Sequence, residues 1–378
     1  MHILIAPNAF KNSLNAADAA EAIEHGLLQS KLRCTCMCFP VADGGDGTAA
    51  LLIEKFNGTI IHTEVYDPLK RKINASFGLI DKGATAVIEL ADASGLRLLH
   101  PEEYDPLHAS TFGTGEMIKH ALDKGVNKII IGIGGSATVD GATGILQALG
   151  IRFLDVDKKV LQHLPESLIG LAFIDTTNID KRIFNVELIV LCDVENMLLG
   201  ETGAATVFGP QKGASAEDVK KLEAALTRFR DITFQQTGKD MAAIKHGGAA
   251  GGVAAGLAVF LNAKLVNGID YFLEITSFGE ALQKADLVIT GEGSIDEQTL
   301  HGKGPFGVAK KAKQKNIPVI GLAGKIPLQP DAGLKKYFDV LMPINNELSL
   351  EKALLQTKDN LMRTAAEIGN LLALKLGF

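Results

Sequence analysis

The chain has 378 residues and a net charge of −6, with an isoelectric point near 5.9. This length favours two domains over one ordinary core. The acidic balance argues against a dedicated nucleic-acid surface or an anionic-membrane surface, and no segment is typical of a signal peptide or a membrane span. The four cysteines show no C-x-x-C or zinc spacing, which fits a reducing compartment. We therefore expect a cytoplasmic protein without nucleic-acid or membrane partners.

Short apolar segments alternate with helical patterns from end to end. Residues 2–7 (HILIAP) predict a buried strand, and residues 15–30 predict the helix that follows it. Further strands are expected in CTCMCFPVA, ATAVIELA, KIIIGIGG, ELIVLCD, ADLVITGEG, IPVIGLAG and DVLMPI. Residues 349–376 predict one long final helix, and residues 247–263 a tightly packed helix rich in Gly and Ala. Apolar strands between helices indicate an α/β fold with parallel sheets covered on both faces.

The stretch VADGGDGT places Asp43 and Asp46 on a glycine-rich loop between a strand and a helix. In parallel sheets, the loops that leave the carboxyl ends of the strands build the binding site. Two acids on bare glycines can approach a metal ion and a substrate closely, and the cation offsets their repulsion. The alternative is that Asp46 caps the helix and Asp43 shapes a turn, which accounts for one acid better than for two.

A second glycine-rich loop, GIGGSATVDGATG, follows the strand expected at residues 127–133 (NKIIIGI) and opens a helix. Backbone N–H groups in such a turn can bind phosphate. Gly132, Gly134 and Ala137 also fit a loose dinucleotide pattern, with Asp155 at roughly the distance of a ribose-binding acid. A tight structural turn explains the same glycines. Phosphate binding, a dinucleotide-dependent oxidoreductase and a purely structural turn all remain open from these residues.

Acids and lysines gather in the other loops that follow strands. The stretch TGEGSIDEQTLHGKGP carries Glu292, Asp296 and Lys303, and APNAFKNSL carries Lys11. Carboxylates can hold Mg²⁺, and lysines can neutralise phosphate, although a polar surface loop is the alternative. The Walker A, protein-kinase, G-x-S-x-G and H-E-x-x-H motifs are all lacking. Acids, lysines and glycine-rich loops together are typical of phosphoryl transfer.

With these loops assembled, the sequence resembles the class I glycerate kinases, bacterial enzymes of glycerate and glucarate metabolism. The resemblance covers essentially the whole chain. Its matching stretches, with x for positions that are not part of the match, are VADGGDGT, GTGE, IIIGIGGSATxDGxxGxxQALG, CDVEN, FGPQKGA, GAAGG, LVITGEGxIDxQxxxGKxPxGVA and PVIGLAG. It implies phosphorylation of D-glycerate to 2-phosphoglycerate, with ATP and Mg²⁺ as the cofactors.

The resemblance also implies two α/β domains. A discontinuous flavodoxin-like domain is expected from residues 1–64 plus 284–378. An inserted domain of restriction-enzyme-like topology is expected from residues 65–283, with the active site in the cleft between the two. The oligomeric state is left open.

The sequence departs from the family pattern at several positions. The first loop commonly reads PDSFKGS or close to it, whereas here Asn8 replaces the acid, while Lys11 and Ser13 match. Ser294 stands where many relatives have Arg, and Val139 where Asn is frequent. These departures keep open a kinase of another small hydroxy acid, a 3-phosphoglycerate product, and a silent protein that only binds metabolites.

Spacing and chemistry suggest three groups of functional residues, with Asp43 as the candidate general base. Asp193 and Glu292 are alternatives as metal or base carboxylates. The catalytic group comprises Lys11, Asp43, Asp193 and Lys303. The group expected to bind phosphate or substrate comprises Ser13, Gly134, Gly135, Ser136, Asp140, Lys212, Gly291 and Gly293. The expected metal ligands are Asp46, Glu292 and Asp296.

Overall fold

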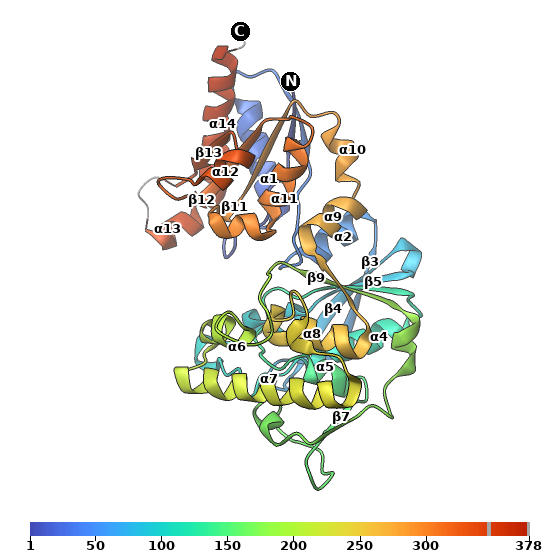
Figure 1. Cartoon of the computed structure of the whole chain (residues 1–378). Coiled ribbons are helices and arrows are strands. Elements are labelled where there is room, and N and C mark those ends of the chain that lie inside the picture. Colours follow the sequence, from blue (N-terminus) through green and yellow to red (C-terminus); the bar gives the residue numbers. More distant parts are fainter. Residues whose placement is uncertain (346–348, 376–378) are drawn as a thin grey trace. The chain divides into compact units, whose positions relative to one another are not determined.

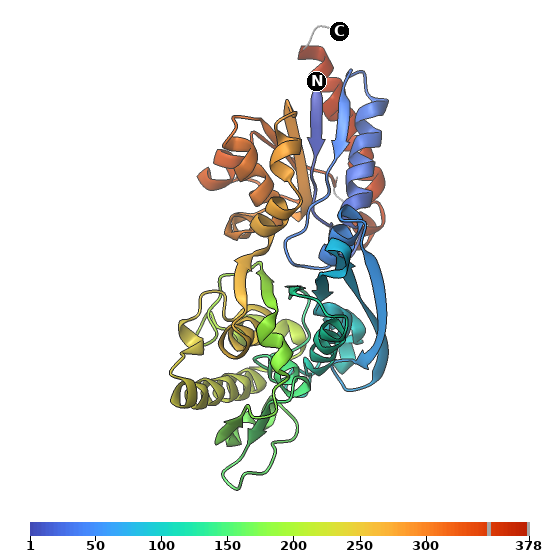
Figure 2. The same cartoon turned by 90° about the vertical axis from the view of Figure 1, so that its right-hand side faces the viewer.

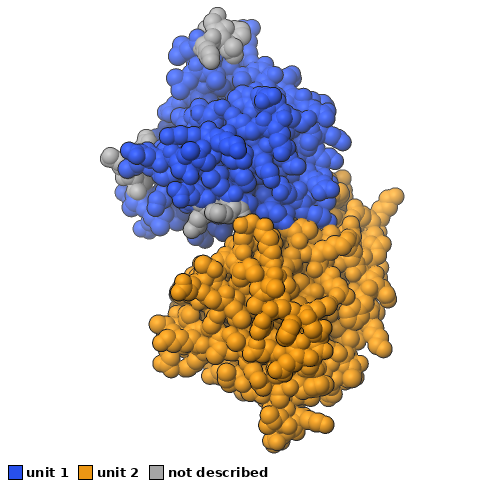
Figure 3. Space-filling view, in the orientation of Figure 1, with its two compact units in different colours: residues 1–43, 267–378 blue, residues 44–266 orange. Residues whose placement is uncertain are grey.

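The computed structural model describes residues 1–345 and 349–375 (Figure 1). Its contacts divide the chain into two compact units (Figure 3). Unit 1 combines the two chain ends, residues 1–43 and 267–378, and unit 2 is the continuous segment 44–266. Each unit is built of helices around its own main sheet, as the α/β expectation requires. No helix in the described part of the chain combines the length and apolarity needed to cross a membrane.

Unit 1 contains a five-stranded parallel sheet. Its strands are β1 (His2–Ile5), β2 (Thr35–Cys38), β11 (Leu287–Ser294), β12 (Val319–Lys325) and β13 (Val340–Pro343). They lie in the order β13-β12-β11-β1-β2. Counted along this unit, that is the order 2-1-3-4-5 of flavodoxin-like folds. The direction of winding reverses between β1 and β11, and such folds bind ligands at the carboxyl ends of the strands flanking that point.

Helices cover both faces of the unit 1 sheet. On one face α1 (Ala16–Gln29) and α14 (Thr357–Lys375) pack side by side (Figure 2). Their apolar side chains form a core with Ile3, Ile5 and Ile289 of the sheet. Helix α11 (Gly304–Lys313) contacts β11 and β12. The unit also contains α9 (Gly268–Ile275), α10 (Phe278–Leu282), α12 (Ala332–Tyr337), α13 (Leu350–Leu355) and the 3-10 turn η8 (Glu297–His301).

The final helix is divided rather than continuous. Helix α13 ends at Leu355, and α14 begins at Thr357. The Thr357 hydroxyl donates to the carbonyls of Ala353 and Leu354 at the break, at 3.0 and 3.2 Å. Side-chain bonds of this kind compete with the regular helical ladder, which explains why one apolar pattern contains two helices. The last residue of the expected helix, Leu376, lies outside the described residues.

Unit 2 contains a six-stranded mixed sheet in the order β10-β9-β6-β5-β4-β3. Its strands are β3 (Thr59–Tyr66), β4 (Lys72–Ile80), β5 (Thr85–Glu89), β6 (Lys128–Gly132), β9 (Glu187–Cys192) and β10 (Lys264–Asn267). Strands β5, β6 and β9 are parallel, as expected, but β3 and β4 form an antiparallel hairpin that the sequence analysis missed. Strand β3 is largely solvent-facing and therefore lacks the continuous apolar run that marked the other strands.

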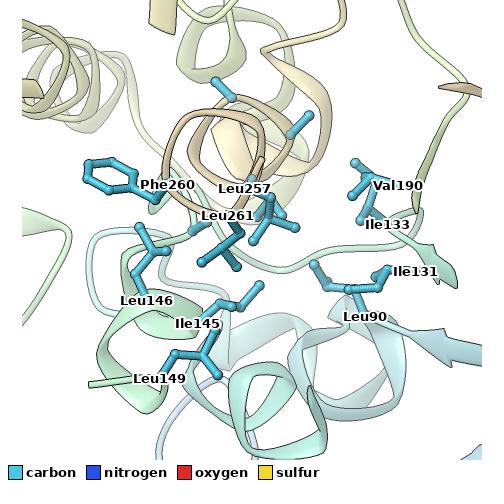
Figure 4. Packing of buried hydrophobic residues seen from close by; sticks show 14 of the residues in the cluster. Leu90, Ile131, Ile133, Ile145, Leu146, Leu149, Val190, Leu257, Phe260 and Leu261 are labelled. Carbon is cyan, nitrogen blue, oxygen red and sulfur yellow. The ribbon is translucent and has the colours of Figure 1, made fainter. Parts of the chain in front are cut away.

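Six helices of unit 2 pack around one large apolar core. They are α3 (Ala91–Ser94), α4 (Phe112–Asp123), α5 (Thr143–Ala148), α6 (Ala204–Phe208), α7 (Ala216–Thr237) and α8 (Ala249–Leu261). Helix α2 (Thr48–Lys55) packs on β4 and β5. In Figure 4, Ile145 of α5 meets Leu257 and Leu261 of α8. Strands β7 (Arg152–Leu154) and β8 (Phe173–Asp175) form a separate antiparallel pair.

Helix α8 confirms the tightly packed helix expected at residues 247–263. Almost all of it is buried, but its first turn is left-handed at Ala250, Gly251 and Gly252. A Cβ on Gly251 would lie 2.1 Å from the carbonyl oxygen of Thr138, and one on Gly256 would lie 2.1 Å from that of Gly141. The small residues of α8 therefore let it support the loop after β6 at backbone distance.

The two units divide the chain at residues other than the expected domain boundaries of 64/65 and 283/284. Residues 44–64 belong to unit 2, because α2 packs on β4 and β5 and β3 pairs with β4. Residues 267–283 belong to unit 1. There the rings of Phe39 and Phe278 are in contact, and Gly307 of α11 leaves room for Ile269.

Candidate active site

Asp43 lies where three loops of unit 1 meet. Its Oδ2 accepts hydrogen bonds from Asn8 Nδ2 at 2.9 Å and from the backbone N–H of Gly304 at 3.2 Å. Asn8 follows β1, Asp43 follows β2, and Gly304 is the first residue of α11. The positive end of the α11 dipole therefore faces a carboxylate, which is a favourable arrangement. This group lies at the point where the order of the unit 1 sheet reverses.

Glu292 belongs to the same group of side chains. It lies near the end of β11, is 8% exposed, and accepts a hydrogen bond from the Thr299 hydroxyl at 3.1 Å. Burial raises the pKa of Glu292 to about 7, and the charge of Asp43 adds to the rise while Lys303 and Lys11 oppose it. The structure thus brings together four of the predicted residues, two acids and two lysines.

The other predicted residues of unit 1 surround this group in different ways. The Ser13 hydroxyl donates to the Leu354 carbonyl at 2.5 Å, which ties the first loop to α13. The carboxylate of Asp296 accepts a hydrogen bond from the Ser294 hydroxyl at 3.3 Å. Its backbone N–H donates to the Thr299 hydroxyl at 3.1 Å, and its carbonyl accepts the N–H of Thr299 at 2.9 Å. These contacts shape the loops on either side of Glu292.

Gly291 and Gly293 lie in the C-terminal half of β11. A Cβ on Gly291 would lie 2.3 Å from the carbonyl oxygen of Leu322, so the pairing of β11 with β12 requires glycine there. An ideal Cβ on Gly293 would lie 3.7 Å from the backbone nitrogen of Lys11. Gly293 therefore lies next to the first loop, whereas Gly291 is needed for packing within the sheet.

In unit 2, the glycine-rich loop after β6 packs against residues 44–46. The N–H of Gly134 donates to the carbonyl of Gly44 at 3.1 Å, and a Cβ on Gly134 would lie 2.7 Å from Cα of Gly45. Gly135 has a φ of +70°, and its Cβ would lie 3.0 Å from Asp46 Oδ1. The glycines therefore allow two backbones to touch, and they bring Asp46 next to the predicted phosphate loop.

Asp46 is paired with an arginine that the sequence analysis did not single out. Arg97 Nη1 donates to Asp46 Oδ1 at 3.2 Å, and Arg97 also bonds to Asp92 and lies 4.0 Å from Glu89. The side chain of Asp46 is 53% exposed. Glu89 ends β5 and accepts the N–H of Ala49 at 2.8 Å, and burial raises its pKa to about 7. An acid ending an apolar strand was a visible signal for Glu89, whereas nothing in the sequence marks Arg97.

Asp140 is fully buried and holds the loop from inside. Its carboxylate accepts hydrogen bonds from the N–H and hydroxyl of Thr111 and from the N–H groups of Ala142 and Gly144, at 2.8 to 3.1 Å. Burial raises the pKa of Asp140, and these donors oppose the rise. Because all of these donors belong to unit 2, the hydrogen bonds of Asp140 stabilise the conformation of the loop.

Lys212 likewise points into unit 2. It is 2% exposed, and its ammonium donates to the Ser136 hydroxyl and to the Thr138 carbonyl, both at 2.7 Å. Burial lowers the pKa of Lys212 to about 7, against the opposing effect of Asp140. The sequence analysis expected Lys212 to bind phosphate or substrate, which stays a prediction. In the structure, its ammonium makes two hydrogen bonds to the loop that contains Ser136.

Two further acids were marked from the sequence. Asp193 directly follows β9, at the carboxyl end of the unit 2 sheet. Asp155 instead accepts the N–H groups of Asp157 and Lys159 at 2.9 Å each and shapes the turn after β7. Because β7 lies outside the main sheet, Asp155 does not follow a strand adjacent to β6. Asp155 is therefore not placed to act as the ribose-binding acid of a dinucleotide site.

The predicted metal ligands are spread over both units, with Glu292 and Asp296 in unit 1 and Asp46 in unit 2. Among the described residues, no three His, Cys, Asp or Glu side chains are grouped as a metal site. Mg²⁺ commonly takes only one or two carboxylates and completes its shell with water and phosphate. The carboxylates near the end of β11 fit that kind of site.

The comparisons with known proteins agree with one another. The model of the glycerate kinase family matches residues 3–373. The glycerate kinase of Bacillus subtilis (strain 168) is 46% identical over 369 residues, or 97% of each chain. The glycerate 2-kinase of Escherichia coli (strain K12) is 40% identical, over 99% of this chain and 98% of its own length.

A solved structure gives the same result. The protein assigned as glycerate kinase 2 from Salmonella typhimurium LT2 superimposes with a TM-score of 0.84, at 42% identity, over 100% of both chains. Fold and comparisons together define an α/β enzyme of the kinase class. The chain belongs to the glycerate kinase family, which confirms the resemblance stated from the sequence and excludes the oxidoreductase alternative.

Proposed function

We propose that this chain transfers the γ-phosphoryl group of ATP to the 2-hydroxyl of D-glycerate and releases 2-phosphoglycerate. One observation carries the proposal. Asp43, Glu292, Lys11 and Lys303 gather at the point where the order of a flavodoxin-like sheet reverses. Membership of the glycerate kinase family supports the choice of acceptor, and the Escherichia coli relative is named for the 2-position.

Asp43 acts as the general base of the reaction. Its Oδ2 is held by two N–H donors, so the carboxylate has a fixed orientation. Glycerate binds with its 2-hydroxyl against this carboxylate, and Asp43 takes the hydroxyl proton as the oxygen attacks. Lys11 and Lys303 contribute positive charge that stabilises the transferring phosphoryl group.

Mg²⁺ supplies charge neutralisation and alignment for the phosphates of ATP. In this chain Glu292 and Asp296 are the carboxylates proposed to hold it, directly or through water. A protonated carboxyl is a poor ligand. Because burial raises the pKa of Glu292 to about 7, we expect Mg²⁺ binding to weaken as the pH falls below that value.

Unit 2 carries a second set of candidate groups, in the loop after β6. The loop at Gly134, Gly135 and Ser136 offers backbone N–H groups and a hydroxyl to the substrate carboxylate or to a phosphate. Lys212 acts behind this loop by holding Ser136. Asp46 and Asp193 remain candidates for contacts to metal and acceptor.

The test is a coupled assay with purified protein, MgATP, D-glycerate and enolase, without phosphoglycerate mutase. Enolase converts 2-phosphoglycerate directly, so phosphoenolpyruvate absorbance should rise at once. A signal that needs added mutase would identify 3-phosphoglycerate as the product instead. Absence of glycerate-dependent ADP release under either condition would contradict the proposal.

A second candidate is a kinase of a different small hydroxy acid. It is favoured by the first loop, where Asn8 contacts Asp43 in place of the acid common in the resembling proteins. Values of kcat/KM for glycerate, lactate, tartronate and glycolate separate the two candidates. The glycerate assignment predicts the highest value for D-glycerate.

A further inference from the structure

Helix α7 carries a groove on the surface of unit 2. The groove has a volume of about 560 Å³, and its lining includes Thr206 of α6 and Ile169 of the 3-10 turn η4 (Glu166–Gly170). Figures 1 and 2 both show α7 at the outside of unit 2. The other lining residues all belong to α7 and are Val219, Lys220, Glu223, Ala224, Thr227, Arg228 and Asp231.

The groove face of α7 lies opposite its buried face. The buried residues of the helix centre on Phe229. Lys220, Ala224, Thr227 and Asp231 are spaced by four, three and four residues, so they form one stripe on the other side of the helix. All four are exposed or partly exposed. Their spacing is the one with which two helices pack along their length.

Exposed apolar side chains lie on α7 and on the elements that pack against it. The turn η4, helix α6 and strand β8 each contact α7. The apolar side chains in question are 42–62% exposed and comprise Ile169 of η4, Phe173 of β8, Val207 of α6 and Phe234 of α7. Exposed apolar side chains grouped in this way are typical of an interaction surface.

The charged residues of the groove differ in the partners that they have within unit 2. Glu223 and Arg228 each form a hydrogen bond with a backbone group at 2.7 Å. Asp231 accepts a bond from Arg230 at 2.9 Å, but the same guanidinium also binds a second acid. In the part of the chain that the structure describes, the Lys220 ammonium has neither an ion pair nor a hydrogen bond. The stripe therefore carries one positive and one negative charge with little compensation.

A second copy of α7 supplies the missing partners. A two-fold axis places two identical helices antiparallel, so each residue meets the one that lies equally far from the axis on the other copy. With the axis between residues 225 and 226, Lys220 faces Asp231 of the second copy, and Ala224 faces Thr227 of the second copy. Opposite charges then meet at both ends of the contact, and small side chains meet at its centre.

The position of this axis also suits the length of the helix. It lies within one residue of the middle of α7, which runs from Ala216 to Thr237. Two copies therefore overlap over nearly the whole helix, which is roughly 33 Å long. An axis far from the middle would leave half of each helix without a partner.

We propose that two copies of this chain associate about a two-fold axis through the stripe formed by Lys220, Ala224, Thr227 and Asp231. The stripe is complementary to itself, as a two-fold contact requires, whereas a surface for a strongly acidic or basic partner would carry one sign of charge. The proposal goes beyond the proposed function, because none of these four residues belongs to the candidate active site.

The first test is sedimentation velocity of the parent protein, Lys220→Glu, Asp231→Lys and the double variant, between about 1 and 100 µM chain. The parent should become dimeric as the concentration rises. Each single reversal brings like charges together at both ends of the contact, so the dissociation constant should rise by about 10-fold or more. The double variant restores opposite charges and should return to within about threefold of the parent. The control is Lys119→Glu, exposed on α4 and outside the groove.

A second variant, Ala224→Arg, tests the centre of the contact. Ala224 is exposed, so a single copy can accommodate the longer side chain. Between two helices that meet at Ala224 and Thr227, the arginine should hold the backbones apart and raise the dissociation constant by about 10-fold or more. Urea midpoints, measured at a concentration where the parent is monomeric, should match the parent and show that the variant is folded.

Three results would overturn the proposal. The first is a parent that stays monomeric at about 100 µM. The second is a dimer whose dissociation constant is the same in the parent, both single reversals and Ala224→Arg, because association would then use another face. The third is a parent that is monomeric alone but binds a different protein through this groove. None of these results depends on the reaction that the chain catalyses, so failure of the proposed function leaves the test of the dimer unchanged.

Discussion

The two groups of candidate residues use their polar side chains in opposite ways. In unit 1, Asp43 and Glu292 are held by a few donors at the carboxyl ends of strands, with Lys11 and Lys303 close by. In unit 2, Asp140 and Lys212 are buried, and their hydrogen bonds hold the loop after β6. Lys212 bonds to that loop from a separate turn, and Asp140 bonds from within it. A charged residue in a glycine-rich loop can thus act either on a substrate or on the loop. The hydrogen-bond partners distinguish the two roles, and the predictions below test that distinction.

The largest expected effect concerns the base of unit 1. Asp43→Asn keeps the size of the side chain but removes its ability to take a proton. We expect kcat to fall by about 10²–10⁴-fold, measured by glycerate-dependent ADP release. The matched control Asp359→Asn, on the exposed face of α14, should stay within about twofold of the parent. If Asp43→Asn keeps kcat within a few-fold, Asp43 is not the general base.

The corresponding acid of unit 2 should act on stability. Asp140→Ala leaves the buried donors of Thr111, Ala142 and Gly144 without their acceptor. We expect the free energy of unfolding to drop by about 3 kcal/mol or more, measured by denaturant titration. The exposed Asp157→Ala is the control. A small loss of stability with a large loss of kcat would place Asp140 with the reacting groups instead.

Glu292 gives a prediction in pH. Its pKa is about 7 in the folded protein and 4.5 as the ordinary value, so the folded state holds the proton more tightly. The contribution of Glu292 to stability is therefore present below about pH 4.5 and lost as the pH rises to about 7. Glu292→Gln should be more stable than the parent by about 2–3 kcal/mol at about pH 8 and nearly equal to it at about pH 4.5.

Urea midpoints across this pH range test the Glu292 prediction, with the exposed Glu280→Gln as the control. A constant difference between Glu292→Gln and the parent would mean that Glu292 is solvated and ionised throughout. That outcome would contradict the burial of the Glu292 carboxyl near the end of β11.

The smallest expected effect concerns Lys212, whose pKa is lowered by burial, whereas that of Glu292 is raised. The pKa of Lys212 is about 7 in the folded protein and 10.5 as the ordinary value, so the unfolded chain holds the proton more tightly. The stability that Lys212 contributes should be lost as the pH falls from about 10.5 to about 7. Lys212→Met should be less stable than the parent by about 1–2 kcal/mol at about pH 9, and by less at about pH 7.

Lys220→Met, on the exposed face of α7, provides the matched control for Lys212. Michaelis constants for ATP and D-glycerate should be recorded beside the unfolding curves. A change in KM without a change in stability would show that the Lys212 amine reaches a substrate.

Much of the fold could be predicted from the sequence because buried parallel strands leave continuous apolar runs. HILIAP and ADLVITGEG are both of this kind, and they pair as β1 and β11. Strand β3 was missed because its exposed residues give no such run. The single final helix expected from the sequence is interrupted at Gln356. The Thr357 hydroxyl bonds to the backbone there, and the spacing of apolar residues does not predict such a contact.

The sequence was enough to predict several residues of the candidate site, but not the hydrogen bonds that they make. Strand-end position was enough to mark Asp43 and Glu292. The hydrogen bond from Asn8 to Asp43 depends on how the Asn8 amide is turned, and its Oδ1 accepts the N–H of Ala9. The direction of Lys212 was equally hidden, because a lysine in a Gly/Pro turn can point toward solvent or inward.

The order of strands in unit 1 has a consequence for biosynthesis. The central pair of its sheet joins β1, from the very start of the chain, to β11, from the last quarter. At about 5–20 residues per second, a ribosome needs roughly 15–60 s to reach the second of these strands after making the first. During that interval all of unit 2, which is continuous in sequence, leaves the ribosome and can fold. The nascent chain must therefore keep two apolar strands from aggregating until their partners have been translated.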